Sequence, residues 1–218
     1  MAITFVAEVE AASNVSGTTL DVLSVVGAAD RLYVAFFGRK GSGATQVVDS
    51  VTGGGLTWTE RSPATDPCGA RDQTRLSVWT AFSATSPGTF TCTGTWNAAT
   101  PERSGIVVSY DGAAETIDDP SSENTLGDPA STCTGGSDNS APNLDVTTAV
   151  ASETIVVGVM TKNRTITTAD ADYVERGFVE VADAQNEMYV HDRIGAPTGT
   201  DNCAHTLSST ADWVMVGL

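Results

Sequence analysis

Apolar and polar residues alternate with a period of two along most of the chain, which is the side-chain period of a β-strand. The alternation is clearest in residues 3–9, 19–25, 75–82 and 187–191. Residues 32–37 and 154–160 are apolar at nearly every position instead, as expected of strands that are buried on both faces. No long segment carries apolar residues at helical spacing. The pattern predicts an all-β protein.

Gly, Pro, Asp and Ser divide these strands at short intervals, and these residues favour turns. The turn segments are residues 41–43, 52–55, 86–88, 111–112 and 196–199. Short strands with such punctuation are typical of an antiparallel β-sandwich or a jelly-roll-like fold. One long irregular stretch, residues 111–143, divides the chain into two parts.

The two parts match each other in five blocks that follow in the same order. The matches are 30–40 with 152–162, 58–61 with 173–176, 75–82 with 187–194, 87–89 with 198–200, and 104–109 with 211–216. Lys40 then falls at the position of Lys162, and Cys92 at that of Cys203. We interpret this correspondence as an internal duplication.

The duplication predicts a first repeat at about 28–111, a loop linker at about 112–143 and a second repeat at about 150–218. Each copy of about 70 to 80 residues is small for a core of its own. We therefore expect a single β-sandwich domain over residues 1–218 in which the copies complete each other. The strands up to Val26 and the strand near 144–149 would supply its edges.

The chain carries 27 acidic and 11 basic residues, a formal charge of -16. This charge repels phosphate backbones and anionic headgroups, so neither nucleic acid nor a membrane surface is an expected partner. The apolar runs are too short for a transmembrane helix. The opening residues have no basic segment before Glu8, so we expect no export signal at this end.

Four cysteines, Cys68, Cys92, Cys133 and Cys203, are too few and too scattered for a disulfide scaffold. They have no C-x-x-C spacing, which argues against a zinc site. Three disulfide pairings remain open beside the simpler interpretation as free or half-buried thiols.

The chain has two histidines, so any Ser-His-Asp or Cys-His nucleophile system must use one of them. A hairpin that turns about Thr198 would place His191 opposite His205. Opposed imidazoles can hold a transition metal, with Asp192 or Cys203 nearby. His191 matches Trp79 of the first repeat, however, which favours a cross-strand packing pair.

Carboxylates gather in the long loop, and a loop of this kind suits a calcium ion better than a glycosidase acid-base pair. The candidates are Asp118, Asp119, Glu123 and Asp128, with Asp170 and Asp172 before a later strand. No Asp-x-Asp-x-Asp-Gly loop is present, which favours solvated charge. We expect no catalytic residue and no cofactor, with calcium the weak exception.

Exposed aromatic rings can stack on sugars. Trp58 and Tyr173 match each other in the repeats, which favours core packing for both. Trp96 has no clear counterpart and follows Thr-Gly-Thr, so we expect it at the surface as the candidate for contact with a host glycan.

Taken together, five segments of the first half resemble a known class of β-sandwich sequences. These segments are DRLYVA (30–35), GLTWTER (55–61), LSVW (76–79), PGTFTCT (87–93) and GIVVSYDG (105–112). The class occurs among tailed-phage virion proteins of the decoration, head-fibre or tail type and in related bacterial surface modules. The resemblance extends over about residues 18–218 and consists of core positions and turns.

This resemblance implies a non-enzymatic virion structural protein, a capsid decoration or a head or tail surface protein. Such a protein assembles in the host cytoplasm and lies on the virion surface. Its partners would be other virion proteins, through self-association or contact with the major capsid or tail protein. The N-terminal edge strand, with Ile3, Phe5 and Val9, is the candidate contact.

Two other functions remain open from the sequence. The alternative is a glycan-binding or adhesion module of a cell-surface protein, which would be extracellular and would use Trp96. An enzyme, such as a glycosidase or an esterase, comes third because no set of residues has the spacing that catalysis needs.

Overall fold

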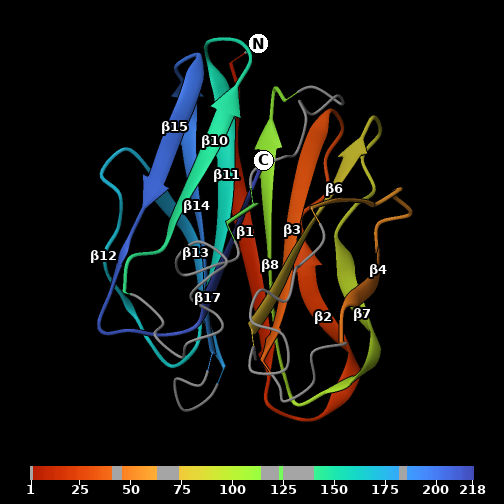
Figure 1. The fold of residues 1–218 in the computed structure, drawn as a ribbon. Coiled ribbons are helices and arrows are strands. Elements are labelled where there is room, and N and C mark those ends of the chain that lie inside the picture. Colours follow the sequence, from red (N-terminus) through yellow and green to blue (C-terminus); the bar gives the residue numbers. More distant parts are fainter. Residues whose placement is uncertain (1, 41–45, 63–73, 114–122, 125–139, 182–185) are drawn as a thin grey trace.

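A computed structural model describes residues 2–40, 46–62, 74–113, 123–124, 140–181 and 186–218. These residues form antiparallel β-sheets joined by turns and loops, with no helix among them (Figure 1). It follows that the described part has no helix able to span a membrane. The prediction of an all-β protein is confirmed.

The first half of the chain builds two sheets. A five-stranded sheet, sheet A, has the order β1-β8-β3-β6-β5, and a three-stranded sheet, sheet B, has the order β2-β7-β4. The strands are β1 (Thr4–Ser13), β2 (Gly17–Val25), β3 (Arg31–Lys40), β4 (Val48–Thr52), β5 (Thr59–Ser62), β6 (Thr74–Ser83), β7 (Phe90–Thr100) and β8 (Glu102–Asp111). Both β1 and β2 lie at sheet edges, as expected.

The second half builds a five-stranded sheet, sheet C, with the order β13-β14-β11-β17-β9, and two small sheets, β10-β15 and β12-β16. The strands are β9 (Glu123–Asn124), β10 (Asn143–Thr148), β11 (Glu153–Thr161), β12 (Ile166–Thr168), β13 (Val174–Val181), β14 (Asn186–Ala196), β15 (Gly199–Ala204), β16 (Thr206–Leu207) and β17 (Trp213–Gly217). The predicted strand near 144–149 is β10, an edge strand.

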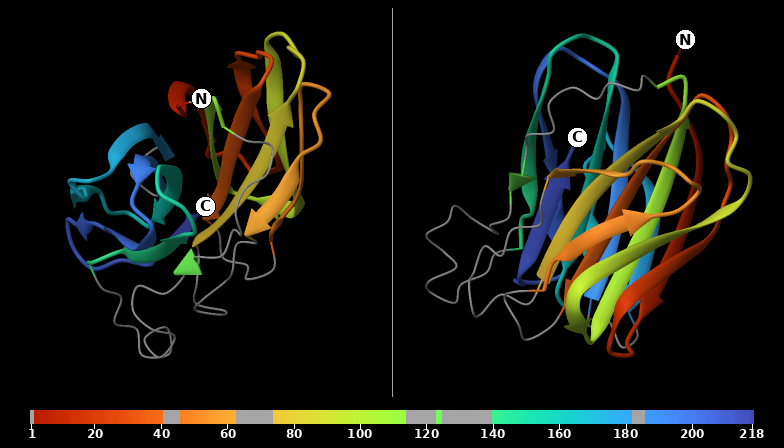
Figure 2. Two further views of the ribbon diagram at one scale, coloured as in Figure 1. Left: turned by 90° about the horizontal axis from the view of Figure 1, so that it is seen from above. Right: turned by 90° about the vertical axis from the view of Figure 1, so that its right-hand side faces the viewer.

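Three apolar clusters hold these sheets together. One lies between sheets A and B, a second joins the inner faces of sheets A and C, and a third lies between sheet C and the small sheets. Both five-stranded sheets therefore pack in the middle of the molecule, with the smaller sheets outside them (Figure 2). Strands β3 and β11 are apolar on both faces because each lies in a sheet that is covered on both sides.

The two halves agree in the details of their pairing. Strand β5 meets β6 with a register shift between Glu60 and Ser62, and β13 meets β14 with a shift between Glu175 and Gly177. The sequence match aligns Glu60 with Glu175, and its continuation by one residue aligns Ser62 with Gly177. A β-bulge of this kind is a specific local feature, and it recurs here at the same place in both sheets.

The last of the five sequence matches is displaced. Ser104 opposes Gly38 across β8 and β3, whereas Val214 opposes Met160 across β17 and β11. Gly38 and Met160 correspond in the match, so Ser104 corresponds to Val214 and not to Ala211, three residues earlier. The division of the chain into two repeats and a linker stays a prediction.

Candidate functional site

The cluster of polar side chains that most resembles a catalytic or metal site lies inside the second half, where β14 faces the end of β15. The rings of His191 and His205 lie 4.5 Å apart between centroids. Cys203 Sγ is 3.3 Å from His205 Nε2, and the backbone N–H of Asp170 donates to His205 Nδ1 at 3.4 Å. The side chains of His191, Cys203 and His205 are all buried.

Burial decides the protonation of this cluster. It lowers the pKa of His191 to about 3, with His205 as a further cause, and lowers the pKa of His205 to about 4. It also raises the pKa of the Cys203 thiol. A Cys-His nucleophile needs a thiolate that a substrate can reach, and this neutral, enclosed pair offers neither feature.

His191 reaches His205 by a different route from the predicted hairpin. Strand β14, which carries His191, pairs with β11 and β13 and not with β15, and His205 lies between β15 and β16, so the two residues are not opposed in a hairpin. Their contact crosses the space between the sheets. The predicted contact and its burial are confirmed, whereas the predicted cross-strand pairing is wrong.

The ring of His191 is an unusual core residue. Within the described residues neither ring nitrogen has a hydrogen-bond partner, although the side chain is fully buried. Glu175 Oε2 lies 3.9 Å from Nε2, too far for a hydrogen bond. No group of three or more His, Cys, Asp or Glu side chains in the described ranges is arranged to hold a metal ion.

A second polar cluster joins the two halves and was missed in the sequence. Tyr110 on β8 donates a hydrogen bond to Asp192 Oδ2 at 3.1 Å, and Arg176 Nε donates to Asp192 Oδ1 at 2.8 Å. The guanidinium of Arg176 also lies 4.4 Å from the ring centre of Phe5 on β1. Burial raises the pKa of Asp192, against the opposing effects of Arg176 and Tyr110.

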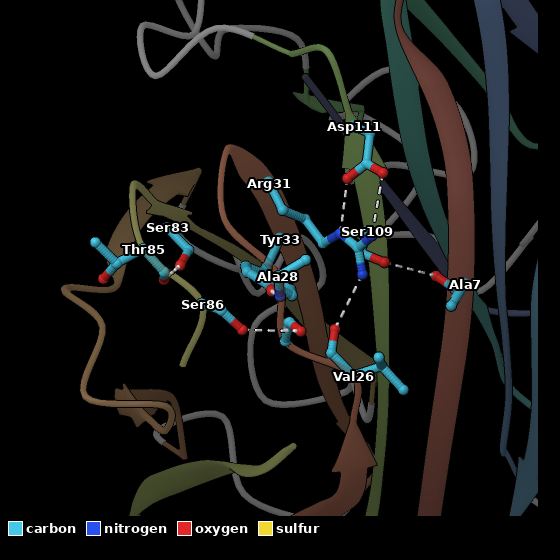
Figure 3. A network of polar contacts seen from close by, with 11 residues as sticks. Ala7, Val26, Ala28, Arg31, Tyr33, Ser83, Thr85, Ser86, Ser109 and Asp111 are labelled. Atoms are coloured by element: carbon cyan, nitrogen blue, oxygen red, sulfur yellow. Dashed lines mark hydrogen bonds and ion pairs between the residues drawn. The ribbon is translucent and has the colours of Figure 1, made fainter. Parts of the chain in front are cut away.

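A third cluster fixes the end of sheet A beside β1 (Figure 3). Arg31 donates to both carboxylate oxygens of Asp111, at 2.7 and 3.1 Å, and to the carbonyl of Val26 at 3.2 Å. The Arg31 hydrogen bond lowers the pKa of Asp111. Ser109 Oγ donates to the carbonyl of Ala7, which ties β8 to β1. The bonds to Asp111 and Ala7 join strands of sheet A, and the bond to Val26 joins β3 to the segment after β2, so all of them are structural.

The predicted contact residues of the N-terminal strand face inward. Ile3 and Phe5 pack against the central cluster, and Val9 packs against the cluster between sheets A and B. Phe5 also meets the ring of Tyr110 edge-on, with centroids 5.9 Å apart. The side chains of these residues therefore serve the protein's own core.

The prediction that Trp96 lies at the surface is wrong. Its side chain is only 2% exposed and packs edge-on against Phe37, with centroids 6.0 Å apart. Trp96 therefore cannot stack on a sugar. The reason lies in β7, where Cys92, Gly94 and Trp96 share the inward face and Gly94 leaves room for the Phe37 ring.

The remaining candidates have mixed outcomes. Asp118, Asp119 and Asp128 lie outside the described residues, as do Cys68 and Cys133. The backbone of Glu123 pairs with Val216 in β17. Cys92 and Cys203 are buried free thiols.

Exposed charges on the described residues are all negative, although some carboxylates, such as that of Asp192, are also buried. Every basic residue in the described part is buried or half-buried: Arg31, Arg39, Lys40, Arg61, Arg75, Arg103, Lys162, Arg164, Arg176 and Arg193. The exposed acidic residues are Glu10, Asp21, Asp30, Asp49, Glu60, Asp145, Asp172, Glu175 and Glu180. The described surface is therefore anionic, because none of its basic residues is fully exposed whereas these acidic residues are.

Comparison with protein-family models, with curated proteins and with solved structures gives no match for this chain.

Proposed function

We propose that this chain is a non-enzymatic structural protein of a tailed-phage particle, a decoration or a head or tail surface protein. It would assemble in the host cytoplasm and lie on the outside of the virion. Its partners would be other virion proteins, either further copies of itself or the major capsid or tail protein.

The observation that carries this proposal is the nested pairing of strands. In the first half β1 pairs with β8, β2 with β7 and β3 with β6. In the second half β9 pairs with β17, β10 with β15 and β11 with β14. Nested pairs divided between two facing sheets are what a jelly roll requires, and jelly rolls recur in viral capsid and lectin domains.

The same nesting supports an antiparallel, jelly-roll-like sandwich that arose by internal duplication. The bulge after Glu60 and the bulge after Glu175 fall at matching positions. In the sequence match β13 corresponds to β5, and β17 to β8. Where sheets A and C face each other, β1 lies beside β13 and β6 lies beside β17, so corresponding strands run across the two sheets in opposite orders. This is the arrangement that an approximate two-fold axis between two related halves would give.

The surface charge supports a position on the outside of the particle. An anionic surface is repelled by packaged DNA and stays solvated in the medium. The alternative of glycan binding is weaker because Trp96, the residue that carried it, is buried. The neutral His191–Cys203–His205 cluster gives no support to an enzyme.

Co-purification with particles tests this proposal. Particles from the lysed source culture are banded in a density gradient, and the chain is quantified by mass spectrometry against the major capsid protein. We expect a fixed copy ratio that survives washing in high salt. We also expect protease added to intact particles to remove the chain, since it would lie on their outside. Recovery of the chain only in the soluble fraction would overturn the proposal.

A further inference from the structure

A lysine, an asparagine and a glutamate meet at the junction of the two halves. Lys40 ends β3, and its Nζ donates a hydrogen bond to Asn163 Oδ1 at 3.2 Å. Asn163 follows β11, so this contact joins the first half to the second. Glu102, opposite Lys40 in the β3–β8 ladder, places Oε2 3.8 Å from the same Nζ. Only 7% of Lys40 is exposed.

We propose that Lys40 and Asn163 form an intramolecular isopeptide bond, with Glu102 as the group that transfers protons. The bond would link Nζ of Lys40 to Cγ of Asn163. It would be a covalent crosslink between β3 and the turn after β11, and it is independent of the proposed function.

The reaction balances without an oxidant or a cofactor. Glu102 first takes a proton from the Lys40 ammonium, which leaves a neutral amine and a carboxylic acid. The amine lone pair attacks Cγ of Asn163, and the C–Nδ2 bond breaks as Glu102 returns a proton to the leaving nitrogen. The excess proton of the new amide nitrogen passes back to Glu102. One C–N bond forms, one breaks, and one ammonia leaves.

The surroundings of Lys40 favour the neutral amine. Burial lowers the pKa of Lys40, and the nearby cation of Lys162 lowers it further, while Glu102 acts in the opposite direction. Oε2 of Glu102 is buried and makes no hydrogen bond within the described residues. This oxygen lies 3.8 Å from Nζ and, among these residues, is committed to no hydrogen bond, so a small shift of either side chain brings it within reach of the ammonium proton.

The second half supplies an internal comparison. Lys162 corresponds to Lys40 in the sequence match, and Asp212 lies where Glu102 lies in the first half. There the lysine and the carboxylate form a direct ion pair, with Nζ 3.1 Å from Oδ2. Lys40 is instead closer to the Asn163 amide than to its carboxylate. Lys40 thus contacts the carbonyl oxygen of an amide, and the carbon that it would attack is bonded to that oxygen. Lys162 contacts the carboxylate of Asp212 instead, so it serves as the matched control.

Intact-mass spectrometry of the full-length protein tests the proposal directly. We expect the wild-type mass to fall below the sequence mass by one ammonia, about 17 Da, after allowance for Met1 removal. The Lys162→Met control keeps this loss, whereas Lys40→Met and Asn163→Ala variants lack it. The full sequence mass in the wild-type protein would overturn the proposal.

Peptide mapping separates the crosslink from other losses of ammonia. Trypsin cuts after Arg39 but not after an acylated lysine, so Lys40 would remain within residues 40–61. That peptide would carry the dipeptide Asn163–Arg164 on its lysine. Separate, unmodified peptides containing Lys40 and Asn163 would contradict the bond.

The Glu102→Gln variant tests the proton-transfer role. It keeps the size of the side chain and removes its ability to accept the proton, so we expect a folded protein with the full sequence mass. A Glu102→Gln protein that still loses ammonia would contradict the role of Glu102. Circular dichroism of each variant shows that a missing crosslink does not result from misfolding.

Discussion

The ring of Phe36 fills the space that the missing side chain of Gly158 leaves at the centre of the molecule. A Cβ atom at position 158 would lie 2.3 Å from Cδ1 of Phe36, closer than any ordinary contact. The two residues correspond in the sequence match, and each lies on the central strand of its sheet. A similar exchange occurs nearby, where Gly38 makes room for the sulfur of Met160. Large and small residues thus alternate across the interface between sheets A and C.

We therefore expect Gly158→Ala to lower the free energy of unfolding by about 1–3 kcal/mol, the usual cost of overpacking a core. Phe36→Ala should cost about 3–5 kcal/mol because it opens a cavity. In the Phe36→Ala background the added methyl of Gly158→Ala should cost much less. Urea unfolding of the two single variants and the double variant measures this coupling, and strictly additive losses would contradict the contact.

Arg61 and Arg176 lie at matching bulges but bond different groups. Arg176 bonds the buried carboxylate of Asp192, whereas Arg61 bonds the hydroxyl of Thr80 at 2.7 Å. Arg176→Met leaves a buried charge without its cation and should cost about 3–5 kcal/mol. Arg61→Met should cost about 1 kcal/mol, the value of a neutral hydrogen bond. Equal losses in urea unfolding would show that Asp192 does not depend on Arg176.

Acid should destabilise the fold through its buried histidines. The pKa of His191 falls from 6.5 to about 3 on folding, and that of His205 falls from 6.5 to about 4. Between pH 6.5 and these lower values the unfolded chain binds more protons than the folded protein does. The free energy of unfolding is therefore highest above pH 6.5 and decreases as the pH falls. Each histidine contributes about 1 kcal/mol per pH unit.

Substitution of His191 by Phe tests this pH dependence, because Trp79 occupies the matching position in the first half. We expect the variant to lose less stability than the wild-type protein between neutral pH and pH of about 4. Unfolding by urea at several pH values provides the measurement. Parallel losses in the two proteins would mean that His191 is not the titrating group.

The two described cysteines should resist thiol reagents in the folded protein. Burial raises the pKa of Cys92 to about 12 and also raises that of Cys203, so neither forms a reactive thiolate near neutral pH. Labelling with a thiol-specific reagent should modify both only after unfolding in urea. Peptide mapping identifies each site, and rapid labelling of Cys203 in the native protein would contradict its neutral, buried state.

Much of the strand arrangement could be predicted from the sequence because alternation reports which face of a strand is buried. The burial of both faces of β11 follows from its apolar run, whereas β6 is buried on both faces although its alternation predicts one. The match between Glu60 and Glu175 aligned the two positions correctly, but the bulge that both strands carry there has no signal in the sequence. Trp96 was placed wrongly because Gly94 interrupts the apolar face, and its Phe37 neighbour belongs to another strand.

The polar clusters could not be predicted, since they depend on how the two halves face each other. Tyr110 and Asp192 are 82 residues apart, and Lys40 and Asn163 are 123 apart. Each of these residues looks like an ordinary strand or turn residue on its own. The sequence match gave the positions of the two lysines without indicating that one would meet an amide.

Cryo-electron microscopy of intact particles from the source that encodes this chain is the most direct test of the proposed function. The account predicts density for the chain in regular, repeated copies on the outer surface of the head or tail, with an anionic surface turned to solvent. Particles that lack this density, together with the chain present only as a free protein, would contradict a structural role in the virion.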